Sequence, residues 1–226
     1  HTLQKLGYSW AKGIFHLSYG MVDLPSGKMK SREGTVVDAD DLIEDVIQEA
    51  QERSEELGKN DEMGEEEKVQ LYSKIGLGAL KYFILKVDPK KRMVFNPSES
   101  IDLNGNTGPF IQYSYARIQA ILRKMPYQNT NALGDYAMNE IEKNIVFHLY
   151  KYPSIVVESA ETYDPSVLTQ YLFQLSKYFN RFYAELKIIA ADGEEEKLFR
   201  IALAYHTGNI LKRGLNLLGI DAVERM

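Results

Sequence analysis

Cysteine is absent from the 226-residue sequence, which excludes disulfide bonds, thiolate zinc sites and cysteine nucleophiles. Histidine is scarce, and its four positions are too scattered to predict a metal site: His1, His16, His148 and His206. No apolar run approaches the roughly 18 residues that a membrane helix needs, and the first residues lack the pattern of a secretion signal. We therefore expect no metal centre, no membrane association and a cytoplasmic location, with which the absence of cysteine is compatible.

The composition is that of an ordinary folded protein, with 44% hydrophobic and 26% charged residues, and the length allows two modest domains. The net charge of −5 is unevenly distributed. The segment 38–67 holds fourteen acidic and two basic residues, so the other 196 residues carry a net charge of +7. Because an acidic segment repels a phosphate backbone, any nucleic-acid surface should lie outside it.

Hydrophobic spacing and capping residues predict a mainly α chain. The residues from 3 to 34 predict strands and loops too short to close a core, so they form either an appendage or part of a larger domain. Residues 92–103 predict extended chain. Two helices are expected before residue 89, the first capped by Asp38 or Asp40, and a bundle of at least four follows, at about 109–124, 134–159, 165–189 and 195–218. Thr107 or Gly108 should cap the first helix of the bundle, ahead of Pro109.

The helix expected at 109–124 has two distinct faces at 100 degrees per residue. One face is apolar and predicts the core: Ile111, Tyr115, Ile118 and Leu122. The other mixes aromatic and cationic side chains: Phe110, Tyr113, Arg117 and Lys124. Such a face suits single-stranded nucleic acid, because aromatic rings stack on unpaired bases and cations meet phosphates or base edges. The alternative is that Phe110 and Tyr113 fill a second packing surface beneath another helix.

A short basic segment, GKMKSREG at 27–34, offers a second candidate site. Its three cations, Lys28, Lys30 and Arg32, together with the hydroxyl of Ser31 and two glycines, could cradle a polyphosphate. The alternative is an ordinary solvated surface turn.

Three segments, taken in chain order, resemble the C-terminal part of class I arginyl-tRNA synthetases: HLSYGMVDLPSGKMKSREGTVVDADDLIEDV, GNTGPFIQYSYARIQAILRK and LKRGLNLLGIDAVERM. The resemblance covers essentially the whole chain. It implies a remnant of a Rossmann-like catalytic domain with α/β structure at 1–37, an acidic helical connecting region at 38–104 and a helical anticodon-binding domain at 105–226. It also implies that the intact protein is an arginine-tRNA ligase.

By this resemblance, the segment 27–34 corresponds to the KMSKS-type loop that closes over ATP. Lys28 and Met29 match the start of its signature, and Ser31 and Arg32 match the continuation, with Ser31 standing where a second lysine is usual. The resemblance implies catalytic roles for Lys28 and Arg32 and ATP binding by Lys28, Met29, Lys30 and Ser31. Either Lys30 or Arg32 would cover the pyrophosphate. ATP, with Mg²⁺, is the substrate expected for the intact enzyme.

The same resemblance assigns a set of residues to tRNA. Phe110, Tyr113 and Arg117 match positions that contact the anticodon loop in relatives, with Phe110 in place of a more usual tyrosine. Tyr183 and the terminal Met226 correspond to further anticodon-facing positions. The implied partners are tRNA-Arg and, in the intact enzyme, ATP and arginine, with the protein acting as a monomer.

The family's HxGH-type ATP motif and its arginine-binding residues have no candidate in the sequence. We therefore expect this chain alone to be inactive as a ligase. Two alternative functions are a non-catalytic tRNA-binding module and a helical interaction scaffold whose acidic segment binds a basic partner.

Overall fold

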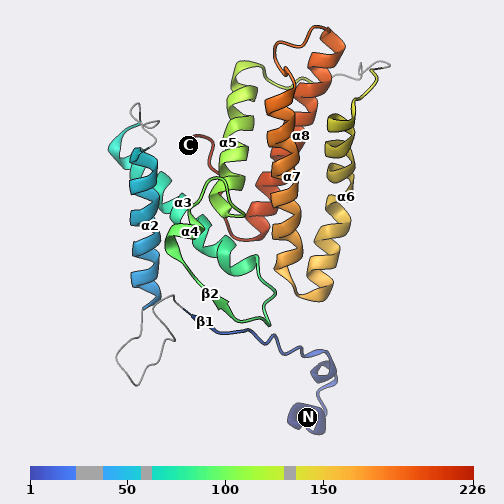
Figure 1. Cartoon of the computed structure of the whole chain (residues 1–226). Helices are drawn as coiled ribbons and strands as arrows, with labels where there is room; N and C mark the ends of the chain where they lie inside the picture. Colours follow the sequence, from blue (N-terminus) through green and yellow to red (C-terminus); the bar gives the residue numbers. More distant parts are fainter. Residues whose placement is uncertain (24–37, 57–62, 130–135) are drawn as a thin grey trace.

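Helices dominate the part of the chain that a computed structural model describes, which comprises residues 1–23, 38–56, 63–129 and 136–226 (Figure 1). The long helices are α2 (Ala39–Glu56), α3 (Glu65–Leu85), α5 (Gly108–Lys124), α6 (Glu140–Thr162), α7 (Pro165–Glu185) and α8 (Glu194–Leu217). The short elements are α1 (Thr2–Lys5), the 3₁₀ helix η1 (Ser9–Gly13), β1 (Val22–Asp23), β2 (Met93–Val94) and α4 (Pro97–Ser100). The prediction of a mainly α fold with a small α/β part is confirmed.

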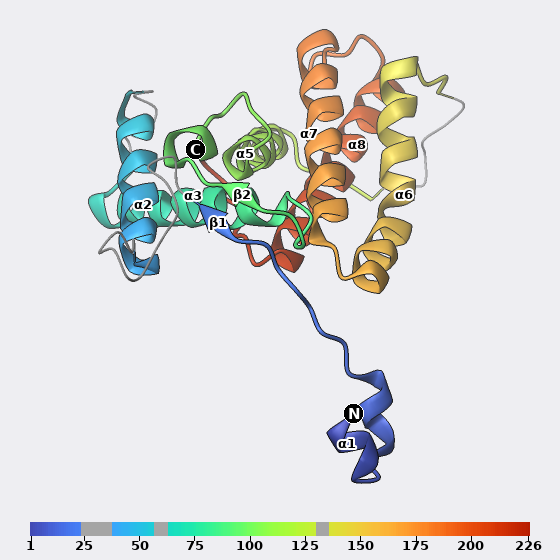
Figure 2. The ribbon, with the colours of Figure 1, turned by 60° about the horizontal axis from the view of Figure 1, so that its bottom comes forward.

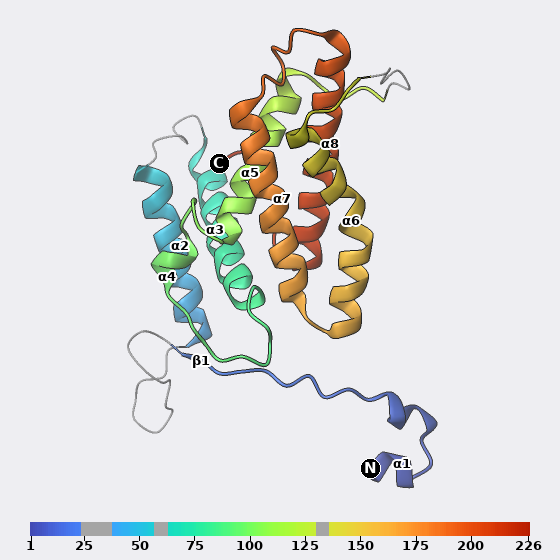
Figure 3. The ribbon, with the colours of Figure 1, turned by 45° about the vertical axis from the view of Figure 1, so that its right-hand side comes forward.

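Helices α5 to α8 form the predicted C-terminal bundle (Figures 1 and 3). Apolar residues on α7 recur every three or four positions, so they lie on one stripe that faces the other helices. Their side chains join a single core with residues of α5 and α8: Ile111, Ile118, Leu168, Leu172, Leu175, Phe179, Phe182, Leu211 and Leu215. The apolar face predicted for α5 is therefore the core face of this helix.

Capping side chains explain where the bundle helices begin. The hydroxyl of Thr107 accepts a hydrogen bond from the backbone N–H of Phe110 at 3.2 Å, which confirms one of the two predicted caps for α5. Asn139 and Glu142 form a reciprocal capping box at the start of α6. That box begins α6 at Glu140, so the predicted start near residue 134 was too early.

Helices α2 and α3 pack against each other beside the bundle (Figure 3). A small cluster holds α2, α3 and the end of β2 together: Val46, Leu80, Phe83 and Phe95. Next to it, β1 and β2 pair in parallel, with Val22 opposite Met93 and Asp23 opposite Val94. An ion pair between Arg92 and Asp23 fastens the same junction. This pairing joins the N-terminal segment to a part of the chain about seventy residues away in sequence.

Two expectations for the irregular segments were wrong. Residues 3–21 contain α1 and η1, followed by irregular chain at 14–21, rather than strands. Among the described residues, strand pairing begins only at β1. Residues 92–103 are not wholly extended, because Pro97 begins the short helix α4. Figure 2 shows the first residues reaching away from the bundle. Their contact with it includes Phe15, whose ring stacks on that of Tyr163 at 4.3 Å.

Candidate nucleic-acid interface

Arg117 lies between two tyrosine rings. Its guanidinium carbon is 4.8 Å from the ring centre of Tyr113, one turn earlier on α5, and 4.7 Å from that of Tyr183 on α7. Cation–π contacts of this length hold a guanidinium in place without neutralising its charge. Tyr183 is 45% exposed, and Tyr113 and Arg117 are half-buried. The arrangement thus presents a fixed cation flanked by aromatic rings that solvent can reach.

Asn180 fixes the same guanidinium from α7. Arg117 Nη1 donates a hydrogen bond to Asn180 Oδ1, and Asn180 Nδ2 donates to Ser114 Oγ at 2.9 Å. Ser114 in turn donates to the carbonyl oxygen of Phe110 at 2.8 Å. This chain of bonds ties the two helices together at the point where the aromatic and cationic side chains meet.

A cavity of about 350 Å³ opens beside Arg117. Two of its lining cations, Arg117 and Lys124, come from α5, and a third, Lys187, comes from the segment that follows α7. The full lining is Arg117, Ala120, Ile121, Lys124, Tyr183, Leu186, Lys187, Ile188, Ile189 and Ala190. The volume lies in the range of small-ligand pockets. An apolar cavity with a cationic rim can receive a flat aromatic base while its phosphates stay at the rim.

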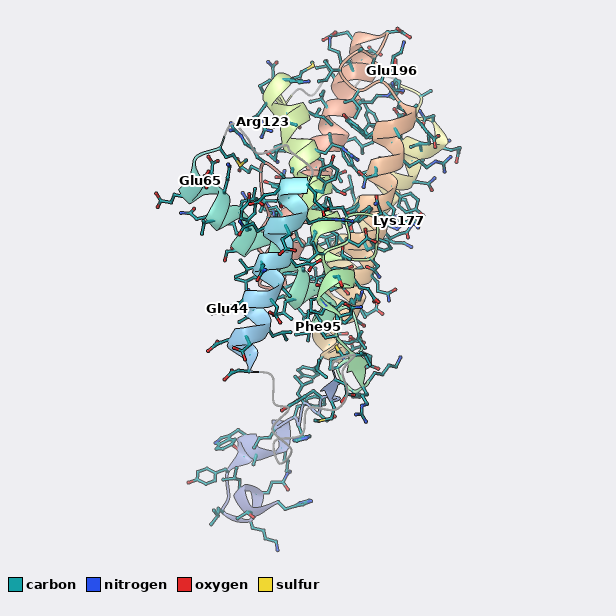
Figure 4. All side chains as sticks on the ribbon, turned by 60° about the vertical axis from the view of Figure 1, so that its left-hand side comes forward. Glu44, Glu65, Phe95, Arg123, Lys177 and Glu196 are labelled. Carbon is teal, nitrogen blue, oxygen red and sulfur yellow. The ribbon has the colours of Figure 1, made fainter. Side chains whose placement is uncertain are left out.

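The aromatic and cationic surface continues along the line where α5 packs against α7. The rings of Phe110 and Phe173 pack with their centres 5.3 Å apart. Lys177 Nζ lies 5.6 Å from the centre of the Phe173 ring, and Figure 4 labels Lys177 on α7. Phe110 is half-buried. Its ring therefore helps to join α5 to α7 as well as bordering the surface, so the packing alternative describes Phe110 better than Tyr113. We call the ridge formed by Phe110, Tyr113, Arg117, Phe173, Lys177 and Tyr183 the α5–α7 ridge.

The structure brings Tyr113, Arg117 and Tyr183 together but sets Met226 apart from them. Met226 packs against a separate cluster that includes Ala50 on α2 and Leu71 and Ile75 on α3. The tail before it is held along α5 by two hydrogen bonds: Gln112 Nε2 donates to Asp221 O at 2.8 Å, and Arg123 Nη1 donates to Glu224 O at 3.1 Å. By helical spacing these two donors lie roughly 120 to 140 degrees around α5 from Arg117.

Several residues of the interface were missed by sequence reasoning. Asn180 carries a usable signal, since it lies three residues before Tyr183 and so shares its face of α7. The cavity residues 187–190 carry none, because helical periodicity extended α7 to about residue 189. The helix ends at Glu185, and Leu186 is already extended as the chain turns to bury Ile188.

The predicted ATP-site residues, Lys28, Met29, Lys30, Ser31 and Arg32, lie outside the described residues. Within the described part of the chain, no group of histidine and acidic side chains is arranged to hold a metal ion. No helix in that part is long and apolar enough to cross a bilayer.

Comparison with known proteins defines the class. Residues 111–226 match the DALR anticodon binding domain, and residues 1–96 match the catalytic domain of class I (R) tRNA synthetases. The first match covers half of the chain, so the chain belongs to the DALR anticodon-binding domain family. The predicted resemblance to arginyl-tRNA synthetases is confirmed by its relatives.

The chain is 51% identical over 224 residues to the arginine-tRNA ligase of Flavobacterium psychrophilum, covering 99% of this chain and 37% of that protein. It is 50% identical over 228 residues to that of Parabacteroides distasonis, covering 99% and 38%. Among solved structures it is similar to the arginyl-tRNA synthetase of Thermus thermophilus, with a TM-score of 0.87 and 29% identity, over 99% of this chain and 38% of that one. The chain thus spans less than two fifths of the length of these relatives.

Proposed function

We propose that this chain is the anticodon-binding part of an arginine-tRNA ligase and that the α5–α7 ridge binds the anticodon loop of tRNA-Arg. The observation that supports this most directly is Arg117, which is held between Tyr113 and Tyr183 at the mouth of the cavity. Unpaired loop bases would stack on the exposed rings, and one base would enter the cavity. Arg117, Lys124 and Lys187 would meet the phosphates around it.

The distribution of charge supports RNA binding at the α5–α7 ridge. The acidic residues of α2 lie on a helix that packs mainly against α3, whereas the ridge lies on α5 and α7 (Figure 4). RNA approaching the ridge would therefore meet cations rather than the acidic face of α2. Met226 would meet the RNA only beyond the ridge, from the tail that α5 holds on another of its faces.

In the intact ligase, the carboxylate of arginine would attack the α-phosphate of ATP, forming arginyl-adenylate and releasing pyrophosphate. A ribose hydroxyl at the 3′ end of the tRNA would then attack the arginyl carbonyl, forming the ester bond and releasing AMP. Lys28 and Arg32 would stabilise the charge that grows on the leaving pyrophosphate, with Met29, Lys30 and Ser31 completing the ATP-binding loop. ATP would enter with Mg²⁺ as part of the substrate. The supporting observation is the match of residues 1–96 to the class I catalytic domain.

We propose the division of the chain that the resemblance implies. Residues 1–37 would carry the ATP-binding loop of the catalytic domain, residues 38–104 would form an acidic helical connecting region within which the match to the catalytic domain ends at residue 96, and residues 105–226 would bind the anticodon stem and loop. The ligase would act as a monomer in the cytoplasm.

Binding of an RNA hairpin that reproduces the anticodon stem-loop of tRNA-Arg tests the proposal. Tyr113→Ala and Arg117→Ala should each weaken binding on the order of tenfold, because a stacking platform or a phosphate contact is lost. The matched controls are Tyr150→Ala, whose side chain is 82% exposed on α6, and Arg213→Ala on the exposed surface of α8. Equal binding by all four variants would refute the proposed role of the ridge.

A further inference from the structure

Behind the wall of the cavity, helix α8 buries an arginine whose donors reach several other groups. The side chain of Arg200 is 7% exposed, and that of Glu142, in the first turn of α6, is fully buried. Arg200 Nε donates to Glu142 Oε1 at 2.7 Å, and a second ion pair joins Arg200 to Glu196, one turn earlier on α8 (Figure 4 labels Glu196). The charge of Arg200 is therefore paired with two carboxylates, that of Glu142, which is fully buried, and that of Glu196, whose side chain is 26% exposed.

Glu142 is held in place independently of Arg200. Its carboxylate accepts a hydrogen bond from the backbone N–H of Asn139 at 2.9 Å, which completes the capping box of α6. It also accepts a hydrogen bond from the hydroxyl of Tyr136 at 3.0 Å. Glu142 is thus a fixed anchor for the guanidinium, and the guanidinium has donors left for other groups.

One of those donors goes to the segment that forms the cavity wall. Arg200 Nη1 donates to the carbonyl oxygen of Lys187 at 2.8 Å. Lys187 belongs to the segment 186–190, which lines the cavity beside Arg117 and Lys124 and is neither helix nor strand. Irregular backbone lacks a regular hydrogen-bond ladder, so its position depends on individual bonds such as this one and on the burial of Ile188.

A contribution to folding stability does not by itself explain why the ion pair between Arg200 and Glu142 is buried here. Replacing such a pair by apolar side chains of similar volume is often neutral or stabilising. What a guanidinium supplies, and an apolar side chain does not, is a planar set of directed donors. Here the donors connect the start of α6, helix α8 and the backbone of the cavity wall.

We propose that Arg200 is a positioning residue that holds the 186–190 wall in the shape that receives an unpaired RNA base. A wall already in place costs less to order when RNA binds, which strengthens binding without any contact between Arg200 and RNA. This inference rests on the proposed binding of RNA at the α5–α7 ridge.

Two variants of the chain separate positioning from stability. Glu142→Gln keeps the capping box and the bond from Arg200 to Lys187, while it weakens the ion pair. Glu142→Gln combined with Arg200→Met removes the Lys187 bond without leaving a buried carboxylate at position 142 unpaired. Arg200→Lys is a third variant, which keeps a cation between Glu142 and Glu196 but loses the forked geometry.

The measurements are hairpin RNA affinity, amide hydrogen exchange of residues 187–191 and the midpoint of thermal unfolding. Glu142→Gln should bind RNA as the wild type does, whatever its midpoint. The double variant should bind about fivefold more weakly and exchange faster at 187–191, with α5 unchanged. Arg200→Lys should show the same two changes in smaller measure.

Two results would overturn the inference: equal RNA affinity in the double variant and Glu142→Gln, or affinity that follows the unfolding midpoint across all variants. Arg117→Ala in the same assay separates this failure from failure of the proposed function. If Arg117→Ala binds like the wild type, the ridge does not bind RNA. If Arg117→Ala binds weakly and the Arg200 variants bind normally, only the positioning role is wrong.

Discussion

Asn180 on α7 accepts a hydrogen bond from Arg117 on α5 and donates one to Ser114, so its amide is oriented from both ends. Because Asn180 is uncharged, this bond fixes the guanidinium and leaves its positive charge in place. The choice of an amide rather than a carboxylate at this position is thus suited to a cation that must meet phosphate.

Changing that amide to a carboxylate should reduce the electrostatic part of RNA binding. In Asn180→Asp, the new carboxylate pairs with Arg117, so hairpin binding should weaken on the order of tenfold. The slope of log affinity against log salt concentration should become shallower by about 0.7, because one fewer counterion is released from single-stranded RNA. Gln170→Glu, an equal change of charge at an exposed position of α7, is the matched control. A slope unchanged from the wild type would contradict the role given to Arg117.

A second prediction concerns Tyr163, which ends α6 with φ 54° and ψ 34°, the left-handed region that favours glycine. Tyr163→Gly should relieve this strain but lose the stack on Phe15, and the two effects, each about 1 kcal/mol, should nearly cancel. In a Phe15→Ala background only the relief remains. Tyr163→Gly should then raise the free energy of unfolding by about 0.5 to 1 kcal/mol.

Urea unfolding of the four members of this cycle measures both effects. Thr162→Gly is the control, since residue 162 is the last residue of α6 and a glycine there relieves no left-handed strain. If Tyr163→Gly instead lowers the free energy of unfolding of the Phe15→Ala protein, contacts of the Tyr163 ring other than the stack on Phe15 stabilise the fold by more than the backbone strain destabilises it.

Features that depend only on residues close together in the sequence could be predicted from it. Features that depend on contacts between distant segments could not. The two faces of α5 follow from helical spacing alone, which places Tyr113 and Arg117 on one surface and Ile111 and Ile118 in the core. The cap at Thr107 is equally local, and the structure confirms it. Tyr183 was reached only through the family resemblance, because its contact with Arg117 crosses between two helices.

The remaining features depend on tertiary contacts. In the cavity wall at 186–190, Ile188 is buried in the core and Arg200 Nη1 donates a hydrogen bond to Lys187 O, and neither contact leaves a periodic signal in the sequence. The pairing of β1 with β2 likewise depends on chain segments far apart in sequence. Two residues per strand are too few for an alternating pattern to show.

A third prediction concerns the close approach of α3 and α5, which sets the position of the ridge helix. A Cβ atom added at Gly108 would meet the backbone carbonyl oxygen of Gly78, which cannot move without shifting α3. A Cβ atom added at Gly214 would meet the Cγ and the two methyl groups of Leu172, which belong to a side chain and can shift without moving a helix backbone. Gly108→Ala should therefore lower the free energy of unfolding by about 1 to 3 kcal/mol and Gly214→Ala by less. Chemical denaturation of both variants checks the order, and the reverse order would contradict this packing.

The last prediction concerns pH and His148, whose ring on α6 lies 4.5 Å from that of Tyr178 on α7. Burial lowers the pKa of His148 below its ordinary value of 6.5, against the opposing effect of the Asn144 carbonyl, and Lys151 lowers this pKa further. The unfolded chain therefore binds a proton at a higher pH than the folded chain does. The folded state should lose stability as pH falls through 6.5 toward the lower folded pKa, and the contribution of His148 should be complete above that range. In His148→Phe, which keeps a ring against Tyr178, the free energy of unfolding should fall less between pH 7.5 and pH 5.5 than in the wild type. Identical pH slopes for the two proteins would show that His148 takes up its proton equally well in the folded and unfolded chains.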